Sequence, residues 1–360
     1  MRTRIRHVVA ALVAGLMTIP LAACGGDDEA GADSFTVGLL LPSRALPRWE
    51  HSDKPFIEQH LKKLCPRCTM EYANAENDAT RQLHQVTSMI TKGVGVLILD
   101  AADTRALRSS IRQAQQEGIP VVAYDRLAEG PISGYVSFDG EEVGKLQGEA
   151  LLKAMGEKAD DENVVMMNGD PTSPNAASYR KGALSVLKGK TKIAKSYDNL
   201  GWTTANAHAN MSAAVSALGP DRIGGVLAAN DAIAAGVIAA LKAAHVRELP
   251  PITGQDAELA AVQRVIRGEQ YMTVYKPFKA EAAAAAAMAV ALGRGEDARD
   301  IATTAIDSPT TRNIPSVLLT PTAVTADTIK QTLVKDGVYS VDQICTRELQ
   351  PACDEAGLTR

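Results

Sequence analysis

Short apolar segments rich in β-branched residues alternate along the chain with longer segments whose apolar residues recur at helical spacing. The strand-length segments lie at 35–41, 94–99, 119–124, 163–168, 223–229 and 271–275. The helix-length segments lie at 79–92, 104–117, 141–155, 203–218 and 231–244. Strands that alternate with helices form parallel sheets with helices on both faces. The pattern therefore predicts an α/β fold built from doubly wound parallel sheets.

One further helix is expected in the alanine-rich stretch 281–291. Alanine is the strongest helix former, and its small side chain lets a helix pack closely against its neighbours. Because this stretch offers few functional groups, we expect it to have no role in an active site.

Length and composition set the size of the molecule and its core. The chain has 360 residues, of which 46% are hydrophobic and only 4% are aromatic. A chain of this length forms about two domains of roughly 150 residues each, with cores built mainly from Ala, Val, Leu and Ile. Trp49 and Trp202 lie beside glycine or polar residues outside the apolar runs. Each could present a flat face to a ligand, although core packing is the commoner role of a single tryptophan.

The beginning of the chain has the layout of an export signal. Residues 1–7 are basic, residues 8–23 form an apolar run, and small residues lead directly to Cys24. The run is too short to span a bilayer comfortably, so we interpret residues 1–23 as a signal peptide. We expect lipidation of Cys24 and a flexible tether over residues 24–34. An ordinary signal peptide with a coincidental cysteine is the alternative. The protein is therefore expected outside the cell membrane, attached to it only through the lipid.

The charge balance and the missing motifs exclude several classes of function. Without the three arginines of the signal, 35 basic residues face 42 acidic ones, a net charge of −7. This balance, and the absence of a basic stripe, argue against a nucleic-acid partner. No phosphate-binding glycine loop, zinc-protease motif or complete penicillin-recognising motif set occurs, so we expect no cofactor, no metal and no enzyme. Paired carboxylates keep a secreted glycosidase as the enzyme alternative.

Four cysteines remain after Cys24, in two close pairs. Cys65 and Cys68 form the motif CPRC, and Cys345 is followed by Cys353. In an oxidising compartment two local disulfides are the simplest interpretation. A redox-active dithiol or half of a zinc site remains open for CPRC.

Polar side chains follow most of the predicted strands. They are Asp100, Asp125, Arg126, Asp139, Asp170, Asn230, Asp231 and Asp256. Ligands of open parallel sheets bind beyond the carboxyl ends of the strands, so these residues predict a polar cleft. Some of them cap helices instead, and Asp139 and Asp231 are the best candidates for caps. Arg126 cannot cap a helix N-terminus, whose dipole is already positive. Paired donors and acceptors of this kind match the adjacent hydroxyls of a sugar.

Six stretches carry a resemblance to a known family: RWE at 48–50, AYDR at 123–126, YVSFDGEEVGKLQ at 135–147, AAND at 228–231, GQDAELA at 254–260 and MTVYKP at 272–277. With these stretches the chain resembles the periplasmic sugar-binding proteins of ABC importers, especially those for D-xylose, from about Val37 to about Gly337.

The resemblance implies a type I periplasmic binding protein fold, with two lobes and three crossings at a hinge. The first lobe would comprise residues 35–137 plus about 277–305. The second lobe would comprise residues 138–276 plus about 306–345. Residues 346–360 would form a C-terminal tail that carries the second disulfide.

The resemblance also implies the residues that contact the sugar: Arg48, Asp125 and Arg126 from the first lobe, Asn175, Trp202, Asn230 and Asp256 from the second, and Lys276 near a crossing. Two departures fall near the cleft. The chain has Ser173 and Pro174 before Asn175 where the xylose binders have an Asp-Asn-Asn run, and its first strand continues into LLPSRAL without the expected acidic pair. Both departures bear on which sugar is bound.

These observations together predict a lipid-anchored, monomeric binding protein. We expect it to bind a monosaccharide, most simply D-xylose or a related pentose or hexose, and to close by a hinge motion. It would deliver the sugar to an ABC permease and its ATPase. A sugar-sensing receptor of the same fold is the alternative. A two-lobed gene repressor is excluded because an export signal stands where a DNA-binding headpiece would be.

Overall fold

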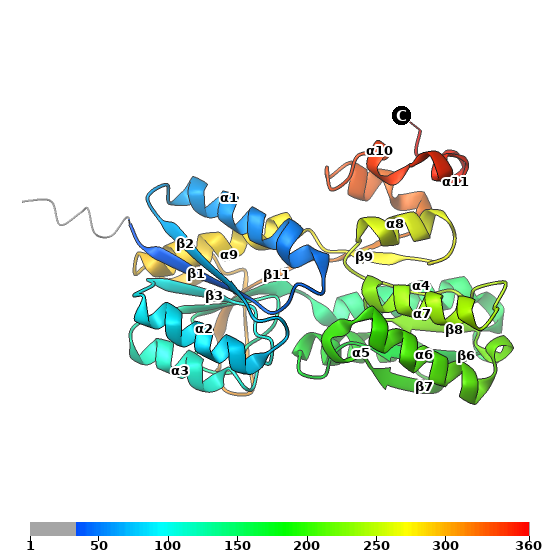
Figure 1. Ribbon diagram of the computed structural model, residues 1–360, viewed down its shortest axis with the longest axis horizontal. Helices are drawn as coiled ribbons and strands as arrows, with labels where there is room; N and C mark the ends of the chain where they lie inside the picture. The colour runs from blue at the N-terminus through cyan, green and yellow to red at the C-terminus, as the bar shows by residue number, and fades with distance from the viewer. Residues whose placement is uncertain (1–33, 360) are drawn as a thin grey trace, which may run out of the picture.

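Two larger β-sheets, each covered by helices on both faces, organise the chain into two lobes that lie side by side (Figure 1), and a third sheet has only two strands. This arrangement comes from a computed structural model that describes residues 34–359. The predicted signal peptide, Cys24 and all but the last residue of the tether lie outside the described residues. The two larger sheets are largely parallel, so the expected doubly wound α/β fold is confirmed.

The first lobe contains a seven-stranded sheet in the order β2-β1-β3-β4-β5-β11-β10. All neighbours are parallel except β10 and β11. The strands are β1 (Thr36–Leu41), β2 (Thr69–Asn74), β3 (Val96–Leu99), β4 (Val121–Tyr124), β5 (Gly134–Phe138), β10 (Thr304–Ile306) and β11 (Ile314–Leu319). The chain reverses its direction of winding between β1 and β3, the position at which open sheets of this kind bind their ligands.

Helices cover both faces of the first sheet, and alternation along the strands explains the two faces. Leu39 and Ile98 pack toward α1 (Lys54–Leu64) and α9 (Phe278–Gly293). Leu40 and Leu97 belong to the opposite core, against α2 (Ala79–Thr91) and α3 (Arg108–Gln116). Successive side chains of a strand point to opposite faces, so continuous apolar strands are what a doubly covered sheet requires.

The second lobe is built around β6 (Asn163–Asn168), β7 (Lys192–Asp198) and β8 (Gly225–Ala228), which are parallel in the order β7-β6-β8. Backbone hydrogen bonds continue this sheet outward. Residues 251–254 bond to Val226 on one side, and the Val274 amide donates to the Gly254 carbonyl on the other. The latter strand, β9 (Thr273–Tyr275), pairs antiparallel with β12 (Thr322–Val324).

Four helices cover this second sheet. One face carries α4 (Gly140–Met155) and α5 (Pro174–Leu187), and the other carries α6 (Thr204–Leu218) and α7 (Asp231–Ala243). Side-chain oxygens accept from first-turn amides at several helix starts, as Asp139 does for α4 and Thr203 for α6. The expected cap at Asp139 is therefore present.

The chain crosses between the lobes three times. It leaves the first sheet after Phe138 and returns at Phe278. The third boundary was expected near residue 305, and this was too early. Strand β11 pairs in parallel with β5, so the first lobe continues to Leu319 and the crossing lies before Thr322. The apolar sequence of β11 has the length of a strand, but no turn signal beside it indicates which lobe the strand joins.

The C-terminal segment packs on the second lobe instead of trailing as a tail. Helices α10 (Val341–Ile344) and α11 (Gln350–Glu355) lie above α8 (Leu259–Ile266) in Figure 1 and share an apolar core with it. A disulfide joins Cys345 to Cys353 within this segment, and another joins Cys65 to Cys68 after α1. Shorter helical turns are η2 (Trp49–Asp53), η3 (Gly156–Lys158), η4 (Leu200–Trp202), η5 (Pro220–Arg222), η6 (Ala298–Asp300), η7 (Ala326–Thr328), η8 (Lys330–Val334) and η9 (Arg347–Leu349).

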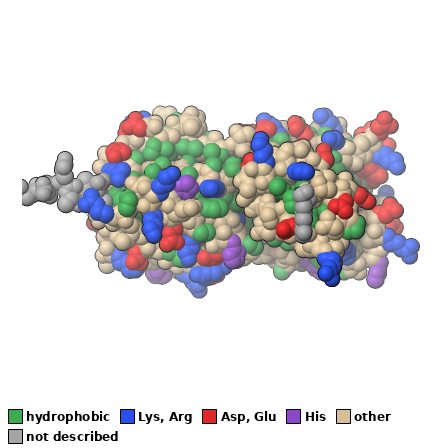
Figure 2. Space-filling model, turned by 90° about the horizontal axis from the view of Figure 1, so that it is seen from above, with side chains coloured by type: hydrophobic (Ala, Val, Ile, Leu, Met, Phe, Trp, Pro, Cys, Tyr) green, Lys and Arg blue, Asp and Glu red, His purple; other side chains and the backbone are tan. Residues whose placement is uncertain are grey.

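Within residues 34–359 no helix is both long enough and apolar enough to cross a bilayer. The same part of the chain has no group of three or more His, Cys, Asp or Glu side chains placed to hold a metal ion. Acidic and basic side chains are interspersed over both lobes on the face shown in Figure 2.

The contact between α4 and α5 generates a prediction about stability. A Cβ atom on Gly144 would lie 2.0 Å from the carbonyl oxygen of Tyr179, which is backbone and cannot swing aside. Gly144→Ala should therefore lower the free energy of unfolding by about 2 kcal/mol or more, through overpacking. Urea denaturation measures the loss, with Glu149→Ala on the exposed side of α4 as the control. A change below about 0.5 kcal/mol in Gly144→Ala would show that the helices can separate freely.

Candidate functional site

One small cavity between the lobes brings together every residue that the resemblance nominated for sugar contact. Its lining includes all eight: Arg48, Asp125, Arg126, Asn175, Trp202, Asn230, Asp256 and Lys276. Five residues that were not nominated complete the lining: Leu46, Trp49, Ser173, Tyr179 and Gln255. The space among these side chains totals about 260 Å³, part of it open to solvent.

The strands deliver these side chains from their carboxyl ends. Asp125 and Arg126 follow β4 directly, Asn230 follows β8, and Lys276 follows β9. Arg48 lies in the loop after β1, immediately before η2. Because the carboxyl ends of parallel strands meet at one edge of a sheet, residues far apart in the sequence converge here. The polar cleft expected from the alternating pattern is formed by both sheets together.

Arg48 is the centre of the site. Its Nε and Nη2 atoms donate to the carboxylate of Asp53 at 3.0 and 2.7 Å, its Nη1 donates to Asp125 at 2.8 Å, and its Nη2 also reaches Glu281 at 3.0 Å. The guanidinium is buried between two aromatic rings, with its carbon 4.0 Å from the centre of Trp49 and 3.9 Å from that of Phe278. The planar guanidinium suits this position because it can stack and form paired hydrogen bonds at once.

Polar contacts cross from one lobe to the other around the cavity. Asn175, in the first turn of α5, donates its Nδ2 to Asp125 Oδ1 at 2.9 Å and to the Asp125 carbonyl at 3.2 Å. Lys276 Nζ lies 3.0 Å from Asp256 and 3.7 Å from Asp125. Arg48 Nη1 lies 3.9 Å from the same Asp256 carboxylate. These contacts tie the two lobes together where the ligand would lie.

Burial and neighbouring charges decide which of these acids are ionised. Burial alone raises the pKa of Asp125, but the cations Arg48, Lys276 and Arg126 lower it to about 2. Burial raises the pKa of both Asp100 and Glu281 well above the ordinary range, and the nearby cations do not offset it. The cations therefore favour the charged form of Asp125, whereas burial favours the neutral forms of Asp100 and Glu281.

Three of the site residues have backbone angles that L-amino acids rarely adopt. The φ angles are 55° at Asp125, 58° at Trp202 and 99° at Asp256. Hydrogen bonds hold these positions in place: the Asp125 carbonyl accepts from Tyr135 and Ser137, and the Asp256 amide donates to Val274. Strained backbone of this kind persists only where the surroundings enforce it, and it is concentrated at functional sites.

Several polar atoms of the cavity wall are buried without a hydrogen-bond partner among residues 34–359. They are Trp49 Nε1, Ser173 Oγ, Trp202 Nε1, Asn230 Nδ2 and Gln255 Oε1. Three of them are N–H donors, one is a hydroxyl and one is a carbonyl acceptor. Buried polar groups are nearly always satisfied in folded proteins, so a group of unsatisfied ones around one cavity indicates a polar ligand.

Asn230 has two functions, and this corrects the expectation for its neighbour. Its Oδ1 accepts from the Ile233 amide and caps α7, while its Nδ2 stays available to the cavity. Asp231 was expected to be the cap, but it is the first residue of the helix. Its carboxylate instead accepts from Gln270, from Thr273 and from the amide of Glu258.

The two tryptophans have different surroundings. The Trp202 ring lies against Gly169, where a Cβ atom would fall 1.9 Å from the ring, and it meets Tyr179 edge to face at 6.2 Å. Its position therefore depends on the glycine. Trp49 is buried under Arg48, but it also lines the cavity. Trp49 is not among the contacts that the resemblance implies.

The start of the alanine-rich helix was also misjudged. No role was expected for 281–291, yet Glu281 is fully buried and pairs with Arg48, and Phe278 just before it stacks on the same guanidinium. The sequence did contain a signal for this role, because Glu281 is a lone acid in the first turn of an otherwise apolar helix. Asp53 gave no comparable signal, because it follows three polar residues of ordinary appearance.

The chain has two doubly wound lobes, three crossings between them and a buried polar cavity where they meet. This is the type I periplasmic binding protein fold, the architecture of a ligand-binding protein. The chain belongs to the periplasmic binding protein domain family, whose model matches residues 37–297. This membership confirms the expectation of a binding protein in place of an enzyme.

Relatives with curated descriptions extend over nearly the whole chain. The D-xylose-binding periplasmic protein of Escherichia coli is 34% identical over 347 residues, which cover 95% of this chain and all of that protein. A multiple sugar-binding periplasmic receptor of Rhizobium radiobacter is 33% identical, and the match covers 87% of this chain and 93% of that protein. An ABC transporter solute-binding protein of Clostridium phytofermentans, solved with β-D-glucose, is 30% identical with a TM-score of 0.77. The match covers 86% of this chain and 99% of that structure.

The position of Arg48 predicts how the empty protein responds to its removal. Arg48→Ala leaves Asp53, Asp125 and Glu281 buried without their shared cation. The free energy of unfolding should fall by about 3–5 kcal/mol in the absence of any sugar. Arg44→Ala, which removes an exposed arginine from ion pairs with Glu50 and Glu76, should cost less than about 1 kcal/mol. Equal losses in the two variants, measured by urea denaturation, would contradict the central position of Arg48.

A pair of coupled acids behind the site predicts the pH dependence of stability. Burial, followed by the charge of Asp256, raises the pKa of Asp231 to about 7. Burial and the charges of Asp231 and Asp256 raise the pKa of Glu258 to about 8. The folded state therefore holds more protons than the unfolded state between about pH 4 and 8. The free energy of unfolding should consequently fall as the pH rises from 5 to 8, by about 1–3 kcal/mol.

Glu258→Gln tests this assignment. It should reduce the slope of stability against pH between 5 and 8, while Glu149→Gln on the exposed side of α4 should leave the slope unchanged. Asp100 and Glu281 contribute with the same sign, so part of the slope remains in Glu258→Gln. Stability that rises over this range would contradict the assignment.

Proposed function

We propose that the protein binds one monosaccharide in the cavity between its lobes, most simply D-xylose, and delivers it to a membrane permease of the ABC type. The observation that carries this proposal is the set of unsatisfied polar atoms around the cavity. Each sugar hydroxyl donates one hydrogen bond and accepts others, so a single small polyol can satisfy donors such as Asn230 Nδ2 and acceptors such as Gln255 Oε1 together.

The remaining chemistry of the wall also suits a sugar ring. Trp202 and Trp49 supply flat apolar surfaces for the C–H groups of a pyranose. The carboxylates of Asp125 and Asp256, and the guanidinium of Arg126, form charge-assisted hydrogen bonds with hydroxyls. A wall that combines aromatic faces with planar charged groups binds a neutral ring without needing a charge on the ligand.

The relatives support a pentose or hexose of ordinary size. Curated relatives are named for D-xylose, and a similar solved structure contains β-D-glucose. Leu46 and Ser173 line the cavity at the two departures from the xylose-binding pattern. Leu46 makes that part of the wall apolar, and Ser173 adds a hydroxyl to it.

Closure and membrane attachment complete the proposal. Arg48 contacts Asp256, Asn175 contacts Asp125 and Lys276 contacts Asp125 across the two lobes, so ligand entry requires those contacts to open at the three crossings. The lobes would open about this hinge, close on the sugar and present the closed form to the permease. Lipidation of Cys24 would keep the protein at the outer face of the cell membrane, as a monomer that needs no cofactor.

A receptor role is the second candidate. The relative from Rhizobium radiobacter is named a receptor, and the same closed form could be recognised by a sensor instead of a permease. Genes for a permease and an ATPase beside this one would favour import. A neighbouring sensor kinase would favour signalling.

Calorimetric titration with D-xylose, ribose, arabinose, glucose and galactose tests the proposed binding. We expect one tight site for a single ring, strongest for D-xylose. Arg126→Ala removes a charged hydrogen-bonding partner from the wall and should weaken binding by about 2–4 kcal/mol. Arg112→Ala, an exposed arginine on α3, is the matched control and should bind as the wild type does.

Either of two results would overturn this proposal. One is the absence of heat or stabilisation with every monosaccharide tested. The other is unchanged affinity in Arg126→Ala, once circular dichroism has shown that the variant is folded.

A further inference from the structure

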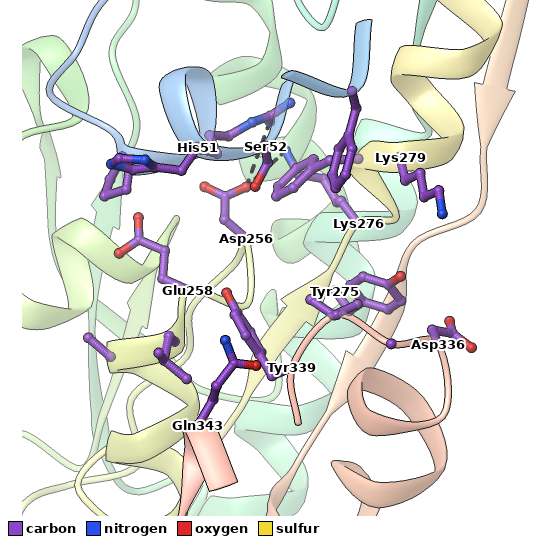
Figure 3. A pocket seen from close by; sticks show the side chains of 18 residues that line it. His51, Ser52, Asp256, Glu258, Tyr275, Lys276, Lys279, Asp336, Tyr339 and Gln343 are labelled. Carbon is purple, nitrogen blue, oxygen red and sulfur yellow. Dashed lines mark ion pairs between the residues drawn. The ribbon is translucent and has the colours of Figure 1, made fainter. Parts of the chain in front are cut away.

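A second and larger cavity lies beside the first, on the side of the crossing between β9 and α9. Together with its open mouth it encloses about 1480 Å³, against 260 Å³ for the first cavity. Figure 3 shows its walls: His51, Ser52 and Lys279 from the first lobe, Glu258 from the second, and Tyr339 with Gln343 from the C-terminal segment. The proposed binding of a single monosaccharide uses none of these six residues.

Aromatic side chains are concentrated in this cavity. Phe56, Tyr275, Phe278 and Tyr339 all line it, in a chain that is only 4% aromatic. They come from three separate parts of the fold: the first helix, the crossing and the C-terminal segment. Ring faces of this kind are the surfaces on which the C–H face of a sugar packs.

Polar groups are spread between the rings. Glu258 Oε1 is buried and has no hydrogen-bond partner within the described part of the chain. His51, Ser52, Lys279 and Gln343 line the same space and bring donors. The wall thus combines apolar faces with separate donors and acceptors, which suits a neutral molecule with many hydroxyls better than a purely apolar one.

The two cavities share a wall. Arg48, Asp256 and Lys276 line both of them, and the ion pairs among these three side chains stand between the two spaces. A ligand in the second cavity would therefore lie next to the bound sugar without occupying its position. It would also touch both lobes and the crossing that joins them.

We propose that this second cavity is a carbohydrate subsite that takes one further sugar ring. The inference rests on the proposed function, because it assigns a second ring to a protein that binds a first. The ring could come from a second free monosaccharide or from the neighbouring unit of a disaccharide. The ion-paired wall between the cavities favours the free ring.

Titration calorimetry of the purified protein with D-xylose and with β-1,4-xylobiose distinguishes the two sources. For a free ring, D-xylose should bind at two sites for each chain, the second more weakly. For a linked ring, one xylobiose should bind for each chain, at least tenfold more tightly than D-xylose.

Ala260→Trp blocks the second cavity from its rim. Ala260 is exposed on α8 and lines only this cavity of the two, so a large side chain fills the space without touching the first site. The variant should lose the second D-xylose site, or the tenfold advantage of xylobiose, and keep the first site unchanged. Ala213→Trp, the same substitution at an exposed position of α6, should behave as the wild type does.

Glu258→Ala gives an independent readout that does not depend on a bulky residue. It removes the unpartnered acceptor and should weaken the second ring by about tenfold, with the first site unaffected. The inference is overturned if D-xylose binds at one site, xylobiose binds no more tightly, and Ala260→Trp matches the wild type. If the wild type binds no monosaccharide at all, the proposed function fails, and the subsite fails with it.

Discussion

The buried guanidinium of Arg48 is the interaction on which the rest of the site depends. It pairs with Asp53 and Glu281, reaches Asp125, and is enclosed by the rings of Trp49 and Phe278. A charge in such a place is stable only if its surroundings are complete, because an unpaired buried ion costs several kcal/mol. Its partners come from the loop after β1, the end of β4 and the start of α9, so this one cation fixes how three parts of the first lobe meet.

The same network extends to the second lobe. Asp125 accepts from Asn175, and Lys276 joins Asp125 to Asp256, so the charges of the first lobe are matched by groups that arrive from the second. While this network uses many polar atoms of the cavity wall, others such as Trp202 Nε1 and Asn230 Nδ2 stay unsatisfied. A buried donor without a partner is costly, and a hydroxyl that supplies the partner recovers that free energy. Selectivity among sugars follows, since an epimer with a misplaced hydroxyl leaves the donor unsatisfied.

Much of the fold could be predicted from the sequence, because the spacing of apolar residues distinguishes buried strands from helices that bury one face. The strands β1, β3 and β6 and the helices α2, α4 and α7 lie within about two residues of their predicted ranges. The sequence could not predict which lobe β11 joins, because its pairing with β5 depends on the path of the chain in space and not on the local spacing of apolar residues. At the site, Asp125, Arg126, Asn230, Asp256 and Trp202 stand out by their place after strands or beside glycine. Arg48, Asn175 and Lys276 required the resemblance, and Glu281 was missed because its partner lies 233 positions away.

The central claim is that one sugar ring supplies hydrogen-bond partners to the unsatisfied polar atoms of the cavity between the lobes. A crystal structure of the protein with D-xylose tests it most directly. The account predicts a pyranose ring in that cavity, packed against Trp202, with its oxygens within hydrogen-bond distance of Trp202 Nε1, Asn230 Nδ2 and Gln255 Oε1. A ring found only outside this cavity, or one that leaves those three atoms without partners, would contradict it.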